Sequence, residues 1–111
     1  EDRIGESCGS LDELEAIKMA FIQTFRDLRV YQLARSTTQK IFLITRSFPI
    51  EEKYCLVNQI RRSSRAVNAM IAEAWARRTY PAAFANKISE ALGEAMETQA
   101  WLDHAADCKY L

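Results

Sequence analysis

The middle of the chain decides the fold, because residues 50–78 read IEEKYCLVNQIRRSSRAVNAMIAEAWARR and show the repeat of a long helix. On a helical wheel, with about 100° between successive residues, the apolar side chains of this segment form one stripe, which predicts a core face. That stripe comprises Leu56, Ile60, Ser63, Val67, Ile71 and Ala74. A second stripe, rich in small residues, comprises Cys55, Gln59, Arg62, Ala66, Ala69, Glu73 and Arg77. Such a helix can pack on two sides, although small residues are equally compatible with exposure to solvent.

Two further helices are predicted before this one. Ser10 and Glu13 form a capping-box pattern that opens a helix over residues 10–24, behind a flexible lead over residues 1–9. A helix over residues 28–47 carries a broad apolar stripe, whose members are Val30, Leu33, Ala34, Thr37, Ile41, Ile44 and Phe48. Each of these segments therefore has an apolar face to bury.

Both prolines of the chain mark helix boundaries. Pro49 ends the helix over 28–47, because the residue before a proline avoids helical backbone angles. Pro81 begins a last helix, predicted over residues 81–107. The core face of that helix comprises Phe84, Ile88, Leu92, Ala95, Gln99, Leu102 and Ala106. Gly93 weakens the same helix by about 1 kcal/mol, and a close approach of a neighbouring helix would explain its presence.

The fold class that follows is all-α: an antiparallel (up-down) four-helix bundle of long helices, forming a single domain over residues 10–111. Short connections between long helices favour this arrangement. Three glycines and two prolines leave too few turn signals for a domain of many hairpins. A composition of 49% hydrophobic and 27% charged residues is typical of a globular protein. Few, long helices have much apolar surface to cover, and self-association covers it.

The residues that would support catalysis or a cofactor are scarce. Carboxylate-bridged di-iron sites need two Glu-x-x-His motifs, but the one histidine, His104, has Trp101 three positions before it. Cys108 and His104 lack a third group to orient them as nucleophile and base. The three cysteines share no zinc-binding spacing, and no phosphate-binding glycine loop is present. We therefore expect a protein that is not an enzyme, with no cofactor, metal or small-molecule substrate.

The expected location is the cytoplasm. The cysteines are odd in number and widely spaced, which favours reduced thiols. The chain opens with no signal-peptide pattern. Its longest apolar run, residues 41–44, is far shorter than the roughly 20 residues that span a bilayer. A membrane is therefore not among the expected partners.

Charge is sorted along the chain, although the formal net charge is zero. Three arginines, Arg61, Arg62 and Arg65, fall within five residues of the helix over 50–78. One stripe of the last helix is acidic and aromatic instead, with Glu90, Glu94, Glu97, Trp101 and His104. Such sorting is typical of a protein that meets partners, or copies of itself, through charged faces.

The arginines divide between two uses. Arginines on an exposed helix face hold phosphates through paired hydrogen bonds, and the nucleic-acid-binding candidates are Arg61, Arg65 and Arg78. Arg62 and Arg77 are expected instead to form ion pairs with Glu73 or the acidic helix, within or between subunits. The subunit-interface or ion-pair candidates are therefore Arg62, Glu73, Arg77, Glu90, Glu94, Glu97 and Trp101. For Arg61 and Arg65, a structural ion pair is as well supported as a phosphate contact.

Several segments, in their order and spacing, resemble one family. They are residues 25–34 (FRDLRVYQLA), 47–49 (SFP), 51–54 (EEKY), 59–62 (QIRR), 68–73 (NAMIAE), 77–78 (RR), 97–99 (ETQ) and 110–111 (YL). The set resembles the bacterial four-helix-bundle proteins encoded in intervening sequences of 23S ribosomal RNA genes. It is also similar to the accessory protein of diversity-generating retroelements. The likeness covers about residues 25–111.

The resemblance implies a four-helix bundle that assembles into a homopentameric ring, with no catalytic role and with nucleic-acid binding proposed for parts of the family. Positions matching the family's basic and Asn/Glu positions are Arg61, Arg62, Arg77, Arg78, Asn68 and Glu73. Relatives carry another helix beyond the position of Leu111, so the fourth helix is either residues 10–24 or a segment beyond Leu111. Val67 and Ala74 stand where relatives often place proline and glycine, which predicts an uninterrupted long helix.

The leading hypothesis is a non-enzymatic, self-assembling helical bundle with RNA or DNA as its partner. In a head-to-tail ring, the basic small-residue stripe of one subunit would meet the acidic stripe of the next. The alternative is a purely structural or protein-interaction module, with no nucleic-acid ligand, whose arginines are all used in internal and subunit pairs.

Overall fold

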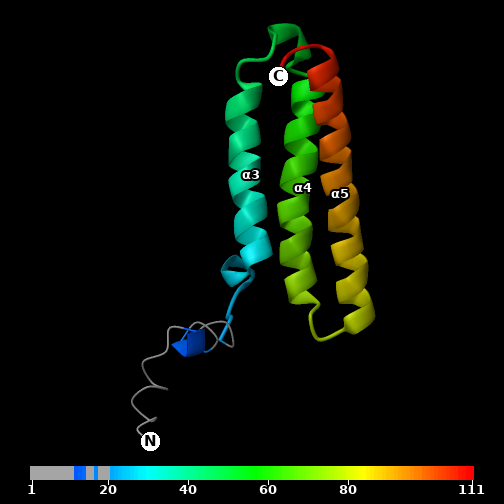
Figure 1. The fold of residues 1–111 in the computed structure, drawn as a ribbon. Coiled ribbons are helices and arrows are strands. Elements are labelled where there is room, and N and C mark those ends of the chain that lie inside the picture. The colour runs from blue at the N-terminus through cyan, green and yellow to red at the C-terminus, as the bar shows by residue number, and fades with distance from the viewer. Residues whose placement is uncertain (1–11, 15–16, 18–20) are drawn as a thin grey trace, which may run out of the picture.

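The structure is a computed structural model that describes residues 12–14, 17 and 21–111. The described residues form helices and turns, with no β-strand among them. Three long helices of this part, α3 (Arg29–Thr45), α4 (Leu56–Ala76) and α5 (Pro81–Asp107), lie side by side and run in alternating directions (Figure 1). The predicted all-α class is confirmed.

The central helix of this layer is α4. It packs against α3 on one side and against α5 on the other, and in the described part of the chain α3 and α5 make no backbone contact with each other. The main core cluster lies where α3 turns into α4 and where α5 ends. It comprises Ile41, Phe48, Leu56, Val57, Ile60 and Ala105, with Trp101, Leu102 and Tyr110 packed against it.

Helix α4 begins later than the sequence predicts. A 3-10 turn, η2 (Ile50–Glu52), follows Pro49, and the backbone of Cys55 leaves the helical region with φ −118° and ψ −100°. The carboxylate of Glu52 accepts the backbone N–H of Leu56 at 3.3 Å, so it stabilises one of the donors at the new helix start. From there α4 is uninterrupted to Ala76, as predicted.

Seven of the fifteen residues of the helix predicted over residues 10–24 lie outside the described residues, and Ser10 of its capping box is one of them. Residues 12–14 and 17 are helical, whereas residues 21–24 are not. The chain then enters α3 through a short 3-10 helix, η1 (Phe25–Asp27). This helix has a capping box of its own, in which the Asp27 carboxylate accepts the backbone N–H of Thr24 at 3.2 Å.

The apolar stripes of α3 and α5 are only partly buried. On α3, Ala34 and Ile41 turn away from solvent, but Val30, Leu33 and Ile44 are exposed. On α5 the exposed apolar residues are Phe84, Ile88, Leu92 and Met96. The prediction that both stripes are core faces throughout is therefore wrong. Among the described residues, α4 is the one long helix against which each of them packs. A single long neighbour covers a narrower face than a stripe of this width needs.

No helix closes in on Gly93 within the described part of the chain. A Cβ atom built at this position would meet nothing within 4 Å. The close helix approach predicted for this glycine is therefore not found among the described residues.

Candidate nucleic-acid and subunit interface

Arg61, one of the three nucleic-acid candidates, is turned onto α3. Its Nε donates a hydrogen bond to Thr45 Oγ1 at 2.9 Å, and its Nη2 donates to the Phe42 carbonyl at 3.4 Å. The guanidinium carbon lies 4.6 Å from the centroid of the Phe42 ring. Because Thr45 is buried, these contacts fasten α3 to α4 and occupy the guanidinium within the chain.

A second polar contact between the same helices is made by Asn68. Its Nδ2 donates to Thr38 Oγ1 at 2.8 Å and to the Ser64 carbonyl at 3.1 Å. The Thr38 hydroxyl is also 2.9 Å from the carbonyl of Ala34. Asn68 thus joins α3 to α4, and this structural role accounts for an Asn at a position that resemblance alone had marked.

The outer side of α4 carries the two other arginines of the cluster. Arg62 and Arg65 are exposed, and Ala69 lies beside them; we call these three residues the arginine face. At about 100° per residue they lie opposite the core stripe of Ile60 and Ile71. In the described part of the chain, neither arginine is joined to an acidic side chain by an ion pair. Both guanidinium groups are therefore available to a partner.

Arg78 belongs to the turn after α4. Its Nη1 donates to the Trp75 carbonyl at 2.9 Å, and its guanidinium carbon lies 4.2 Å from the centroid of the Trp75 ring. Arg78 is exposed, so this stacking orients the guanidinium while leaving one side of it open to solvent.

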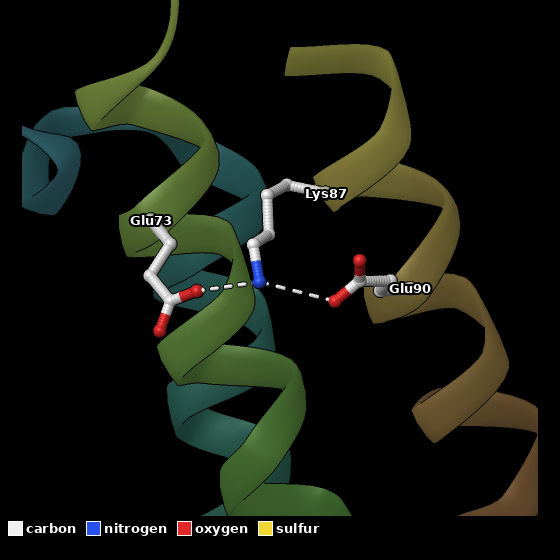
Figure 2. Close-up of polar contacts among 3 residues, drawn as sticks. All are labelled: Glu73, Lys87 and Glu90. Atoms are coloured by element: carbon white, nitrogen blue, oxygen red, sulfur yellow. Dashed lines mark hydrogen bonds and ion pairs between the residues drawn. The ribbon is translucent and has the colours of Figure 1, made fainter. Parts of the chain in front are cut away.

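Lys87 of α5 bridges two carboxylates (Figure 2). Its Nζ lies 2.8 Å from Glu73 Oε1 on α4 and 3.1 Å from Glu90 Oε1 on its own helix. The hydrogen bond and charge of Lys87 hold the pKa of Glu73 below its ordinary value, with a smaller contribution from the charge of Arg77. Within the chain, Lys87 therefore takes the place that the sequence had assigned to Arg62 or Arg77.

Lys87, the one lysine of α5, is not among the residues that the sequence analysis singles out. The signal available in the sequence was its i, i+3 spacing to Glu90. Its bond to Glu73 crosses between two helices, and the sequence alone does not show which faces of two helices meet.

The rest of the acidic stripe is arranged along α5. The Trp101 Nε1 donates to Glu97 Oε2 at 3.2 Å, and the Trp101 ring lies 5.9 Å from the His104 ring. Glu90 and Glu97 are exposed, and Glu94 is half-buried. We call Glu90, Glu97 and Trp101 the acidic face; it presents two carboxylates and part of an indole ring to solvent.

Among the described residues, no group of three or more His, Cys, Asp and Glu side chains is placed to hold a metal ion. None of the described helices is long and apolar enough to cross a bilayer.

The fold and these faces define an all-helical domain that carries its arginines on one helix and its carboxylates on the next. The chain belongs to the 23S rRNA-intervening sequence protein family, because the model of that family matches residues 26–111. This match confirms the family resemblance of the sequence; the similarity to the retroelement accessory protein stays a resemblance. No curated protein and no solved structure matches the chain.

Proposed function

We propose that this protein is a non-enzymatic, self-assembling helical protein that binds RNA or DNA through the arginine face. The observation that carries the proposal is the state of Arg62 and Arg65. They are adjacent on one exposed face, and Glu73, the one acidic residue of α4, is held by Lys87 instead.

The arginine face suits phosphate groups for physical reasons. Residues three apart on a helix are neighbours, so both guanidinium groups reach the same side. The side chain of Ala69 is short and does not protrude from this side of the helix, which lets a nucleic-acid backbone come close. Guanidinium groups hold phosphate oxygens through two parallel hydrogen bonds and release counterions as they do so.

Self-assembly would use a different basic patch. The exposed Arg77, at the C-terminal end of α4, and the acidic face of the next subunit are complementary in charge, which leaves the arginine face to the ligand. Because these are two different patches, they make a head-to-tail contact. Repeated head-to-tail contacts form a ring when the rotation between neighbouring subunits closes the circle. A homopentamer is the stoichiometry that the family resemblance implies, and we include it in the proposal.

The second candidate is a structural module without a nucleic-acid ligand. It is favoured because the acidic face is complementary in charge to the arginine face as well, so subunit contacts could use both of its arginines. In that case assembly and any nucleic-acid binding would not be separable by substitutions on this face.

Binding of structured RNA and of duplex DNA at about 50 and 200 mM salt tests the proposal. Each phosphate contact contributes about 0.9 to the slope of log affinity against log salt, so Arg62→Gln with Arg65→Gln should lower that slope by roughly two. Arg35→Gln with Arg29→Gln removes the same charge from exposed positions of α3 and serves as the control.

Light scattering on the same variants separates the two candidates. Intact assembly with weakened binding supports the arginine face as the ligand surface. Loss of assembly in the double variant supports the structural module. Absence of binding by the wild-type chain at the lower salt concentration removes nucleic acid from the proposal.

A further inference from the structure

We propose that the nucleic acid held by the arginine face is an unpaired strand, and that its bases stack at the turn between α4 and α5. Two platforms are present there: the ring of Tyr80, and the guanidinium group of Arg78, which lies on the ring of Trp75. We call these three residues the stacking turn. This inference deepens the proposed function and rests on it, because the arginine face supplies the phosphate contacts.

Both platforms are open to solvent. Tyr80 is 68% exposed, and as the residue that precedes α5 it makes no capping hydrogen bond with its side chain. Arg78 is exposed too. Its hydrogen bond to the Trp75 carbonyl, at 2.9 Å, helps to hold the guanidinium carbon 4.2 Å from the centroid of the Trp75 ring. Unpaired bases stack on aromatic rings and on arginine planes of this kind.

The charge around the stacking turn suits phosphate. Residues 74–86 contain two arginines and no acidic residue. The short helix η1 packs against α4 and lies at the same end of the helix layer (Figure 1). It adds a second arginine on an aromatic ring, since the guanidinium carbon of Arg26 lies 4.4 Å from the centroid of the Phe25 ring. Sites for single strands combine these two features, because the strand has a charged backbone and exposed base faces.

The stacking turn is joined to the arginine face along one side of α4. Residues seven apart on a helix lie within about 20° of each other. Trp75 comes seven residues after Asn68, which contacts α3, and Ala72 comes seven residues after Arg65 on the outer side. The short side chain of Ala72 therefore lies between the two sites. From Arg62 to the end of α4 is roughly 20 Å at about 1.5 Å per residue, a length that suits about four nucleotides.

A duplex would use these groups less well. Helix α4 is the central helix, with α3 and α5 packed on its two sides. Since helices pack about 8–10 Å apart, a layer of three is too wide for the major groove, which is about 12 Å across. Away from its ends, a duplex also covers both faces of every base. It therefore offers phosphates to the arginine face but no base to the stacking turn.

The proposed subunit contact leaves the stacking turn accessible. Arg77 comes four residues after Glu73, whose carboxylate is bonded to Lys87 of α5, so Arg77 lies on the α5 side of α4. Trp75 lies on the other side, toward α3. The acidic face of a neighbouring subunit therefore reaches Arg77 without covering Arg78.

Fluorescence anisotropy tests the inference with two labelled probes, a strand of about 12 nucleotides and a duplex of the same length, at about 50 mM salt. We expect the strand to bind about tenfold more tightly than the duplex, or better. Tyr80→Ala should weaken strand binding by about 5- to 150-fold, the usual effect of losing one base–aromatic contact, and should leave duplex binding unchanged. Tyr80→Phe keeps the ring and should keep the affinity.

Tyr54→Ala is the matched control. Tyr54 is 81% exposed and carries a cation as well, with the Lys53 Nζ 5.4 Å from the centroid of its ring. It lies at the other end of α4, however, close to the acidic Glu51 in the chain. Its replacement should leave strand binding unchanged, and circular dichroism checks that both variants keep their helices. An equal loss of affinity in Tyr54→Ala and Tyr80→Ala overturns the stacking turn.

Ultraviolet cross-linking of a strand that carries 5-bromouridine locates the bases. We expect mass spectrometry to find the cross-link at Tyr80 or Trp75, and cross-links confined to other parts of the chain overturn the inference.

These outcomes also separate the stacking turn from the proposed function. Suppose that strand and duplex bind equally, that Tyr80→Ala has no effect, and that Arg62→Gln with Arg65→Gln weakens both. The stacking turn is then overturned, while the arginine face remains the phosphate site. If neither probe binds to the wild-type chain, both proposals are overturned.

Discussion

The ammonium group of Lys87 on α5 lies 2.8 Å from the carboxylate of Glu73 on α4, beside the turn that joins the two helices. The contact holds the two helices together at the end remote from the main core cluster, which lies around Ile60 and Ala105. A polar bridge thus supports the part of the α4–α5 pair where apolar packing is thinner.

The pH dependence of this bridge is the first prediction. The pKa of Glu73 is lowered in the folded chain, so its contribution to stability is present above the ordinary value of 4.5 and is lost as the pH falls through the lowered pKa. Lys87→Met should therefore lower the melting temperature at neutral pH and have little effect well below pH 4.5. Lys40→Met on α3 is the control, and an equal loss at both pH values would contradict the role of the Glu73 charge.

Gly93→Ala should stabilise the chain. Gly93 lies inside α5, its backbone is helical, and a Cβ there meets no atom within 4 Å. Alanine reduces the conformational entropy of the unfolded chain, so we expect a gain of about 0.5–1 kcal/mol in the free energy of unfolding. Urea denaturation measures it. Loss of assembly in this variant would reveal that a neighbouring subunit approaches the glycine.

Tyr110 should titrate well above the ordinary pKa of a tyrosine, which is 10. Its hydroxyl donates to Glu52 Oε2 at 2.8 Å, and this hydrogen bond is the main reason why its pKa is raised to about 12. A raised pKa means that the stabilisation is complete below the ordinary value of 10 and is lost as the pH rises toward 12. Ultraviolet titration should show a late tyrosine transition, and Tyr110→Phe or Glu52→Gln should remove it.

The long helices were predictable because apolar residues recur at helical spacing within each of them. Pro81 and the apolar spacing of α5 are local signals, and the structure follows them. The start of α4 was not predictable in the same way. Glu51 and Glu52 suit a helix start at Pro49, but the chain uses the segment as a 3-10 turn and caps Leu56 with Glu52.

The candidate site was harder to predict. Its arginines differ in whether a neighbouring helix offers them a hydrogen-bond partner, and this depends on the tertiary packing. A helical wheel separates Arg61 from the core stripe but does not show that Thr45, 16 residues earlier, accepts its Nε–H. The prediction that the apolar stripe of α3 is buried throughout was wrong for the same reason. Apolar spacing marks Leu33 as core-facing, whereas the number of neighbouring helices decides whether it is covered.

Arg61 and Arg65 should therefore separate stability from binding. Arg61→Gln removes two hydrogen bonds to α3 and the stacking on Phe42, so we expect a loss of about 1–2 kcal/mol in the free energy of unfolding. Arg65→Gln alters an exposed side chain and should change that free energy by less than about 0.5 kcal/mol. Nucleic-acid affinity should follow the opposite order, with the larger loss in Arg65→Gln. Measured by urea denaturation and filter binding on the same samples, equal effects of the two substitutions on both properties would contradict the assignment of Arg61 to the helix contact and of Arg65 to the ligand.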